Sequence, residues 1–371
     1  MKHYLYLCGC LIWLAACNVS SADNGDVLII PVDVKQDSPV GLSEIADNIQ
    51  KIELETSDEC LIRSIRQVIC VDDRIFVHDG QGVGVIHVFD YSGKFLFGID
   101  KRGQGPGEYL GILGITADPE KRHLYVGTLS KILRYDLDDG HFIDEFTKSE
   151  PGYIHFENDI IYVLREVEGR PTDQEGWFAN KTVMWRYSLD WQLIDTLVMK
   201  TRIFDRITGS FPFNTDIISH DSQNNLYVYY PVMNRPPNPN LRPQNELRYE
   251  PHDTLYMLDD NRLKPYAKLK FSNDKPSQPN KSISYLFRTS NLLIAKYQNF
   301  SEEEDKLFCY DFNNKTGKNM TNGFTDDVYD TGITDIRLLN SQYFYYVKAV
   351  KDIPAYTEEP NPVLYIGKLK E

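Results

Sequence analysis

Two short hydrophobic patterns recur along the chain, always in the same order. The first is a run of three mostly apolar residues, which occurs at Ile75–Val77, Leu124–Val126, Ile161–Val163, Leu226–Val228, Leu293–Ala295 and Phe344–Tyr346. The second follows each of these, at Ile86–Asp90, Ile132–Asp136, Met184–Tyr187, Thr254–Met257, Leu307–Asp311 and Leu364–Ile366. Short β-branched and aromatic runs of this kind are typical of strands. Each pair therefore predicts two neighbouring β-strands.

Residues that favour tight turns precede each first pattern. They are Asp72–Asp73, Asp118–Pro119, Asn158–Asp159, Asn224–Asn225, Ser290–Asn291 and Asn340–Ser341. Asp and Asn accept turn geometry readily, so these positions predict hairpins. The repeats lie roughly 40 to 70 residues apart, which matches the blades of a β-propeller that carries some long insertions.

The first repeat resolves into four strands, A to D. We expect them at Ile65–Val71, Arg74–His78, Val85–Asp90 and Phe95–Asp100, with a turn between the last two at Tyr91–Lys94. The second repeat has Asp138–Gly140 at the corresponding turn.

The last repeat lacks a fourth strand, because the sequence after its third strand, Leu364–Leu369, is too short. A spare strand, Ile49–Thr56, lies before the first repeat. We expect it to complete the last blade, which would remove an exposed sheet edge. The predicted fold is an all-β, six-bladed β-propeller over residues 26–371, closed by this N-terminal strand. The weaker run Asp26–Val34 indicates a further strand without a definite place.

The first residues, MKHYLYLCGCLIWLAAC, have the form of an export signal. A polar start precedes the apolar run Tyr4–Trp13, which is far shorter than the roughly 20 residues of a membrane-spanning helix. Leu14–Cys17 matches the lipobox of bacterial lipoproteins, and the alternative is an ordinary signal peptide that contains a Cys. We expect residues 1–16 to be removed, Cys17 to be lipidated and residues 17–25 to form a flexible tether.

This leader places the protein in the cell envelope, anchored by lipid. Asn18 is not the Asp that favours retention in the inner membrane, so the outer membrane is expected, while the side of that membrane stays open. The net charge of −14 argues against nucleic acid and anionic lipid as direct partners. An envelope glycan, peptide or protein is the expected partner.

Three cysteines, Cys60, Cys70 and Cys309, lie beyond the leader, and they show no zinc-binding spacing. An odd number leaves at least one free thiol in an oxidising compartment. Cys60 and Cys70 could pair only if their strands are adjacent. Cys309 lies in an apolar string and is expected to be an ordinary buried residue.

The segments Gly93–Ile99 and Arg102–Tyr109 read GKFLFGI and RGQGPGEY. With Ile52–Thr56 and Leu61–Ile62, they resemble the six-bladed β-propeller lipoproteins of Bacteroidota, and more distantly the NHL-repeat propellers. The resemblance covers most of the mature chain but is sharpest over the first two repeats. It implies the fold and the lipid anchor, and it implies no shared activity.

Long insertions follow the second strand of three repeats, at Arg165–Val183, Tyr230–Asp253 and Lys348–Val363. Loops of this kind and the crossovers between blades share one face of a propeller, so we expect binding there. Arg235, Arg242 and Arg248 are candidates to hold an anionic group. Tyr249, Trp177 and Phe178 are candidates to stack on a sugar or a peptide side chain. The alternative is that these residues only pack the loops.

The string from Arg102 to Tyr109 is a crossover between the first two blades. Its glycines, Gly103, Gly105 and Gly107, either cradle an anion or shape a tight loop, and the absence of a following Lys-Ser/Thr favours the loop. Arg102, Gln104, Glu108 and Tyr109 are accordingly either ligand contacts or structural partners.

No motif of a known catalytic site is present. Two hypotheses remain. The first is a lipid-anchored binding or protein-interaction module, with no cofactor. The alternative is a propeller hydrolase or lactonase, or a carbohydrate-active enzyme, with a divalent metal held by Asp, Asn and Glu at the central channel. The sequence predicts no particular metal ligands, ligand identity or oligomeric state.

Overall fold

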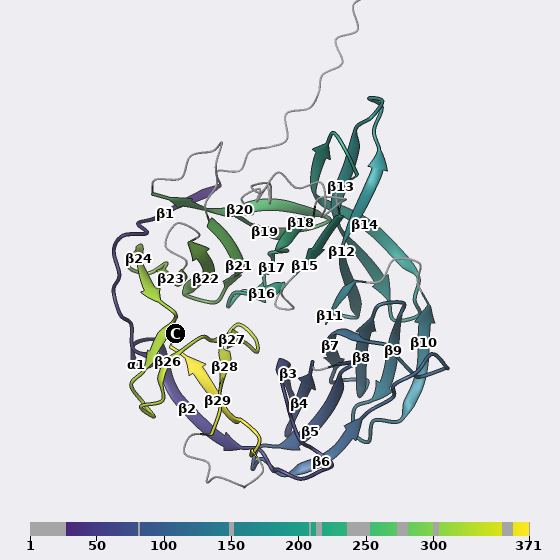
Figure 1. Cartoon of the computed structure of the whole chain (residues 1–371), viewed down its shortest axis with the longest axis vertical. Helices are drawn as coiled ribbons and strands as arrows, with labels where there is room; N and C mark the ends of the chain where they lie inside the picture. The colour runs from purple at the N-terminus through teal and green to yellow at the C-terminus, as the bar shows by residue number, and fades with distance from the viewer. Residues whose placement is uncertain are drawn as a thin grey trace, which may run out of the picture.

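The computed structural model describes residues 27–80, 82–147, 152–207, 209–212, 217–235, 253–272, 281–299, 304–350 and 359–370. It confirms the six-bladed β-propeller (Figure 1). Each blade contains four antiparallel strands, the first of which lines a central channel, and blade 4 has a fifth strand that is parallel to its neighbour. All twelve recurring hydrophobic patterns lie in the strands they predict.

The first three blades follow the simple chain order. Blade 1 consists of β3 (Ile65–Val71), β4 (Arg74–Asp79), β5 (Val85–Asp90) and β6 (Phe95–Ile99). Blade 2 consists of β7 (Ile112–Asp118), β8 (His123–Thr128), β9 (Lys131–Asp136) and β10 (Phe142–Thr147). Blade 3 consists of β11 (Tyr153–Glu157), β12 (Ile160–Pro171), β13 (Phe178–Ser188) and β14 (Leu193–Phe204).

The other blades include strands from the N-terminal part of the chain. Blade 4 consists of β16 (Ile218–His220), β17 (Leu226–Val228), β19 (Thr254–Asp259), β20 (Arg262–Phe271) and, parallel to β20, β1 (Leu28–Val32). Blade 5 consists of β21 (Lys281–Arg288), β22 (Leu292–Asn299), β23 (Glu304–Asp311) and β24 (Thr316–Thr321). Blade 6 consists of β27 (Arg337–Leu338), β28 (Tyr343–Lys348), β29 (Val363–Leu369) and β2 (Ala46–Glu53).

Two small sheets lie outside the blades. One pairs β15 (Gly209–Pro212) with β18 (Val232–Arg235), and the other pairs β25 (Phe324–Asp326) with β26 (Gly332–Thr334). The short helix α1 (Leu42–Ile45) directly precedes β2. In the part of the chain that the structure describes, no helix is long and apolar enough to cross a membrane. Cys60, Cys70 and Cys309 are unpaired, and Cys309 is buried as expected.

The predicted turns explain why the strands fold back so tightly. Asp72, Asn158, Asp159 and Asn224 have φ angles of 52°, 50°, 60° and 62°. Asp and Asn tolerate this left-handed region better than other residues with a Cβ. A positive φ at these positions also gives the twist that joins two antiparallel strands by a short loop.

The ring closes as predicted, because β2 pairs antiparallel with β29 and completes blade 6. The bounds differ: the closing strand is Ala46–Glu53 rather than Ile49–Thr56. The last predicted residues leave the sheet because they bond elsewhere. Thr56 Oγ1 accepts a hydrogen bond from the Asn361 amide at 2.8 Å, and the Glu55 amide donates to the Gly93 carbonyl at 2.8 Å.

The described part of the run Asp26–Val34, for which the sequence predicted a strand without a definite place, begins a segment along the rim. We call this segment, residues 28–41, the strap. Its strand β1 joins the outer edge of blade 4, where Ile30 and Val32 are buried. Single bridges then join Asp37 to Asn319 of blade 5 and Gly41 to Thr325 of β25. Figure 1 shows this purple segment running past blades 4 and 5 before it enters blade 6 as β2.

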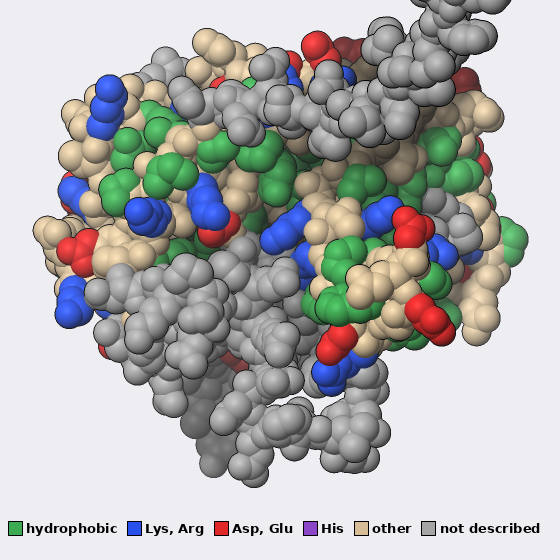
Figure 2. All heavy atoms as spheres, turned by 90° about the horizontal axis from the view of Figure 1, so that it is seen from above, with side chains coloured by type: hydrophobic (Ala, Val, Ile, Leu, Met, Phe, Trp, Pro, Cys, Tyr) green, Lys and Arg blue, Asp and Glu red, His purple; other side chains and the backbone are tan. Residues whose placement is uncertain are grey.

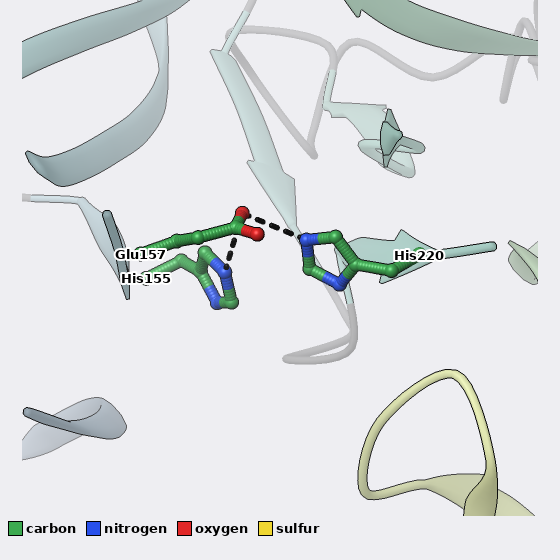
Figure 3. A group of neighbouring side chains, drawn as sticks. All are labelled: His155, Glu157 and His220. Atoms are coloured by element: carbon green, nitrogen blue, oxygen red, sulfur yellow. Dashed lines mark hydrogen bonds and ion pairs between the residues drawn. The ribbon is translucent and has the colours of Figure 1, made fainter. Parts of the chain in front are cut away.

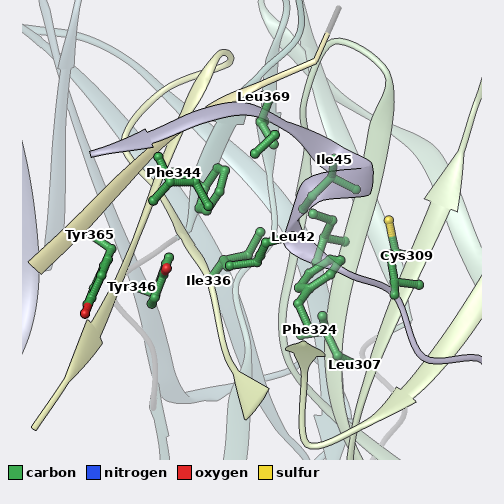
Figure 4. Close-up of a cluster of buried hydrophobic side chains, with 14 of the residues drawn as sticks. Leu42, Ile45, Leu307, Cys309, Phe324, Ile336, Phe344, Tyr346, Tyr365 and Leu369 are labelled. Carbon is green, nitrogen blue, oxygen red and sulfur yellow. The ribbon is translucent and has the colours of Figure 1, made fainter. Parts of the chain in front are cut away.

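The hydrophobic core consists of six clusters, and each cluster lies between two neighbouring blades of the described structure. Figure 4 shows the one between blades 5 and 6, which combines Leu307 of blade 5 and Phe344 of blade 6 with Leu42 of α1. Burying a side chain of this size stabilises the fold by about 1.5 to 3 kcal/mol. Every blade therefore depends on both of its neighbours.

We expect Ile52→Ala in β2 to lower the free energy of unfolding by about 2 to 4 kcal/mol, because Ile52 is 2% exposed in the cluster between blades 6 and 1. Chemical denaturation would measure the change. Leu96→Ala is the control, because Leu96 is also in an outermost strand but is 41% exposed. Equal stability of the two variants would contradict the packing of β2.

Candidate functional site

The crossover from blade 1 to blade 2 contains four of the predicted site residues. Tyr109 is buried, and its hydroxyl donates to the Ile99 carbonyl at 2.9 Å. Glu108 accepts a hydrogen bond from the Gly105 amide at 2.9 Å. Arg102 is exposed and pairs with Asp100, while Gln104 is exposed. Within this crossover, Glu108 and Tyr109 thus shape the loop from inside.

The amides of the three glycines all have partners inside the protein. Gly103 donates to the Tyr109 carbonyl at 3.0 Å, Gly105 donates to Glu108, and Gly107 donates to Glu145 at 2.9 Å. Blade 2 also holds the loop, because the Lys131 ammonium donates to the Gly105 carbonyl at 2.8 Å. These amides are therefore not directed at a cavity in which an anion could lie.

Arg102 also borders a cleft on blade 1 with a volume of about 810 Å³. Four carboxylates line this cleft, from Asp58, Glu59, Asp79 and Asp100. Asp79 accepts the amides of Arg63 and Ser64, both at 3.0 Å. The cleft is thus acidic, and two of its four carboxylates, those of Asp79 and Asp100, already have partners in the protein.

The predicted loop Arg165–Val183 of blade 3 is mostly strand, which corrects the sequence analysis. Strands β12 and β13 continue through it and turn only at residues 172–177. Together with the end of β14 they form a projection, which we call the arm (residues 165–183 and 198–204). Figure 1 shows it extending beyond the ring. The sequence pattern did not predict these strand extensions, because charged residues interrupt the alternation of apolar and polar positions.

A buried ion pair stabilises the interior of the arm. The carboxylate of Glu166 pairs with the guanidinium of Arg202, and each side chain is 2% exposed. Thr182 Oγ1 also donates to Glu166 at 2.6 Å. Asn180 is buried and accepts the Gly169 amide at 2.9 Å. Because removing one partner would leave a buried charge without compensation, this network holds the three strands in one arrangement.

The outer surface of the arm is hydrophobic in several places. Trp177, at its turn, is 36% exposed, and Val198 and Ile203 of β14 are each 50% exposed. Seen from above, this side of the molecule presents hydrophobic side chains between basic and acidic ones (Figure 2). Strand β14 is the last strand of its sheet, so one of its edges has no strand partner among the described residues.

The insertion of blade 4 meets the arm through the small sheet β15–β18. The backbone of Arg235 pairs with that of Gly209, and β15 contacts β12 of the arm. The structure therefore brings Arg235 and the hairpin that carries Trp177 to the same side. Arg242, Arg248 and Tyr249 lie outside the described residues, as does Cys17.

The central channel contains a cavity of about 290 Å³, lined by the first strands of all six blades. Three polar side chains, His155, Glu157 and His220, converge at one end of it (Figure 3). His155 and Glu157 come from β11, and His220 ends β16 of the next blade. These strands lead into the tight A–B turns, so the cluster lies at the opposite end from the insertions.

Both imidazoles of this cluster lie beside the carboxylate of Glu157. His220 Nε2 and Glu157 Oε2 are 2.8 Å apart, and His155 Nε2 and Glu157 Oε2 are 3.7 Å apart. The two imidazole rings lie 5.6 Å apart with an angle of 30° between their planes. Asn224 Nδ2 donates to the other carboxylate oxygen, Glu157 Oε1, at 3.0 Å.

Burial and neighbouring groups set the charges here. Burial lowers the pKa of His155, which favours its neutral form at neutral pH. Burial alone would raise the pKa of Glu157, but the imidazoles of His155 and His220 outweigh this effect and lower it to about 2. The cluster therefore combines an anionic carboxylate with a neutral imidazole.

The sequence analysis did not select these three residues. Because side chains alternate across a strand, the spacing of His155 and Glu157 would have placed them on one side of a strand. His220 is 63 residues from Glu157, and only the order of blades around the ring brings them together. Among the described residues that line this cavity, Glu157 is the one carboxylate, and the Asp, Asn and Glu metal site of the enzyme alternative stays a prediction.

The chain belongs to a family described as a domain of unknown function, DUF4934, which matches residues 27–370. No curated protein matches the sequence. Among solved structures, it is similar to a Bacteroides fragilis NCTC 9343 protein named "Putative exported protein", with 17% identity and a TM-score of 0.62, over 92% of this chain and 100% of that one. This likeness shows the fold.

Two weaker structural matches are also propeller proteins. U3-55K has 12% identity and a TM-score of 0.42 over 89% of this chain and 100% of its own. BamB from Moraxella catarrhalis has 10% identity and a TM-score of 0.39 over 86% of this chain and 97% of its own. The fold and the family match together define the chain as a β-propeller of a family described as of unknown function, with the Bacteroides fragilis protein as a structural neighbour.

We expect Gly107→Ala to destabilise the protein by about 2 kcal/mol, because Gly107 has a φ of 71° and an added Cβ would lie 2.7 Å from the ring of Phe142. Thermal or chemical denaturation would measure this. Gly111→Ala is the control, since the added Cβ would meet only Leu129 at 3.7 Å. A Gly107→Ala protein as stable as the control would contradict the structural role of the crossover.

Proposed function

We propose that this chain is an exported lipoprotein that binds a polypeptide partner of the cell envelope through its arm. The observation that carries this proposal is the exposed outer strand of the arm. Its edge has no further strand beside it among the described residues, and Val198 and Ile203 stand half-exposed along it. Strand edges with apolar side chains bind extended peptides by adding them to the sheet.

A polypeptide fits this surface better than a glycan does. Sugars are held by flat aromatic rings surrounded by polar groups, whereas the exposed apolar residues in the arm part of β14 and in the segment that follows it are the aliphatic Val198, Ile203 and Ile207. Trp177 at the turn adds one large aromatic anchor, of the kind that dominates binding energy in protein interfaces. The rigid interior of the arm limits the conformational entropy that binding costs.

The lipid anchor rests on the sequence Leu14-Ala15-Ala16-Cys17. The segment between Cys17 and the start of the family match at residue 27 is rich in small and polar residues (NVSSADNGD), which suits a tether. Such a tether would hold the ring within a few nanometres of the membrane, where envelope proteins are accessible to the arm. The similarity to a Bacteroides exported protein agrees with export.

The arm predicts which substitutions weaken partner binding. Peptides selected from a displayed library on the wild-type protein should bind at least tenfold more weakly to Trp177→Ala and to Ile203→Ser, because each change removes an exposed apolar contact. Surface plasmon resonance would measure the affinities.

Leu193→Ser is the matched control, because Leu193 lies at the other end of the same strand and is 54% exposed. Its affinity for the selected peptides should equal that of the wild type. The proposal would be wrong if all three variants bound alike, or if a glycan array gave ligands while the peptide library gave none.

Lipidation of Cys17 makes a separate prediction about membrane association. Cys17→Ser should abolish incorporation of a labelled fatty acid and move the protein from the membrane fraction to the soluble fraction, because the thiol is the site of lipidation. Cys10→Ser, which changes a leader cysteine outside the lipobox, should keep both properties. Continued labelling of Cys17→Ser would rule out this anchor.

A further inference from the structure

The cluster at the end of the channel contains donor atoms that suit a transition metal. Two imidazoles and one carboxylate, from His155, His220 and Glu157, each offer one donor atom, and these atoms all lie within 4.8 Å of one another. Imidazole nitrogen is a common ligand of Zn²⁺ and related ions, whereas Ca²⁺ and Mg²⁺ prefer oxygen. We propose that these three residues bind one divalent transition-metal ion, for which Zn²⁺ is the best match.

The separations between donor atoms are those of a site that is close to its bound geometry. Donors that surround Zn²⁺ tetrahedrally at about 2.0 to 2.1 Å lie about 3.3 Å from one another. The distances from Glu157 Oε2 to the two Nε2 atoms are 2.8 Å and 3.7 Å, one shorter and one longer than this value. The two imidazole donors also lie within 4.8 Å of each other, so adjustments of the side chains alone would bring all three donors around one ion.

His155 supplies an observation that points to a ligand. Its side chain is 27% exposed, but its Nε2 atom is shielded from solvent and has no hydrogen-bond partner among the described residues. A buried polar atom without a partner costs free energy of about 1 to 3 kcal/mol. An ion between His155 and Glu157 would satisfy this nitrogen.

Asn224 is not one of the proposed ligands, but it orients the Glu157 carboxylate. Its amide donates to Glu157 Oε1, which leaves Oε2 directed toward the two imidazoles. Outer hydrogen bonds of this kind orient metal ligands and strengthen binding. The side chain of Asn224 is positioned by a turn in which its own φ is 62°.

The channel leaves room beside the ion. The three protein ligands all come from blades 3 and 4, and the cavity of about 290 Å³ extends to the inner strands of the other four blades. A site with three protein ligands and an open side keeps a position for water or another small ligand. An ion here would also bridge two blades across their junction.

A purely structural role makes a different prediction. The contact between His220 and Glu157, with Asn224 behind it, already joins blades 3 and 4 without any ion. His155 adds only a longer contact to that link, since its Nε2 lies 3.7 Å from the carboxylate. If the cluster were only a link, the wild type would bind no stoichiometric Zn²⁺ and replacing His155 would leave metal binding unchanged.

The second group of possible ligands in the described chain provides a control. Asp136, Asp139 and His141 also approach one another, but they belong to the exposed turn between β9 and β10. Their contacts are explained by that turn, in which Asp139 binds the amide and the ring of His141 at 3.0 and 2.7 Å. We therefore propose no metal site at this turn.

The test uses the full chain, purified in detergent and freed of metal by a chelator. Calorimetric titration with Zn²⁺ should show one ion per chain, with Ca²⁺ and Mg²⁺ at least a hundredfold weaker, and Co²⁺ should give visible absorption bands of an imidazole-bound ion. His155→Ala should lower the Zn²⁺ affinity at least a hundredfold. Glu157→Gln, which keeps the shape of the carboxylate without its charge, should lower it at least tenfold.

His141→Ala should bind Zn²⁺ as the wild type does. The melting temperature of metal-free His155→Ala should remain near that of the wild type, so that loss of binding is not loss of fold. If that variant does not fold, anomalous diffraction from Zn²⁺-soaked wild-type crystals decides the matter, with a peak expected between the three side chains. No stoichiometric Zn²⁺ binding by the wild type, unchanged binding by a folded His155→Ala, or no such peak would overturn the proposal.

Discussion

The antiparallel pairing of β2 with β29 is the contact on which the ring depends. Without it, blade 6 would end at β29 with an unpaired edge, and the hydrophobic cluster between blades 6 and 1 would lose Ile52 and Leu54. Asn361 reinforces this junction, because its buried amide bonds to the backbone of Ile62 at 2.7 Å and of Cys60 at 2.8 Å. The strap makes closure more robust, since the same segment contacts blades 4 and 5 on its way to blade 6.

Closure of the ring also fixes the positions of the side chains that line the channel. Around it, side chains of one inner strand bond to the backbone of the next: Gln67 to Ile115, Thr116 to Phe156, and Ser219 to Arg288. The contact between Glu157 and His220 occupies the corresponding position between blades 3 and 4. Because these strands are held from both sides, the donor atoms at the channel end are preorganised. The arm differs in kind, since it projects from the ring and depends on its own buried ion pair.

Much of the fold could be predicted from local pattern, because each blade repeats the same strand and turn chemistry. The Asp and Asn turns and the two middle strands of each blade follow from residues close together in sequence. The role of the N-terminal strand follows from a count of strands, because the last repeat lacks one and the chain has a spare one before the first repeat. Two features could not be predicted. The arm combines charged residues such as Glu166 and Arg202 that become buried only when three strands meet. The cluster of His155, Glu157 and His220 requires His220 to lie beside Glu157. The order of the blades creates this contact, and no local sequence motif predicts it.

Hydrogen exchange of the native full chain tests the central claim, that β2 closes the six blades into one cooperative unit. The decisive comparison is between the amides of β2 and β29 and those of β4, the second strand of blade 1. The account predicts that β2 exchanges only on global unfolding, as β4 does, because its removal opens the cluster between blades 6 and 1. Exchange of β2 amides orders of magnitude faster than those of β4, with the other blades still protected, would show that the ring does not depend on this strand.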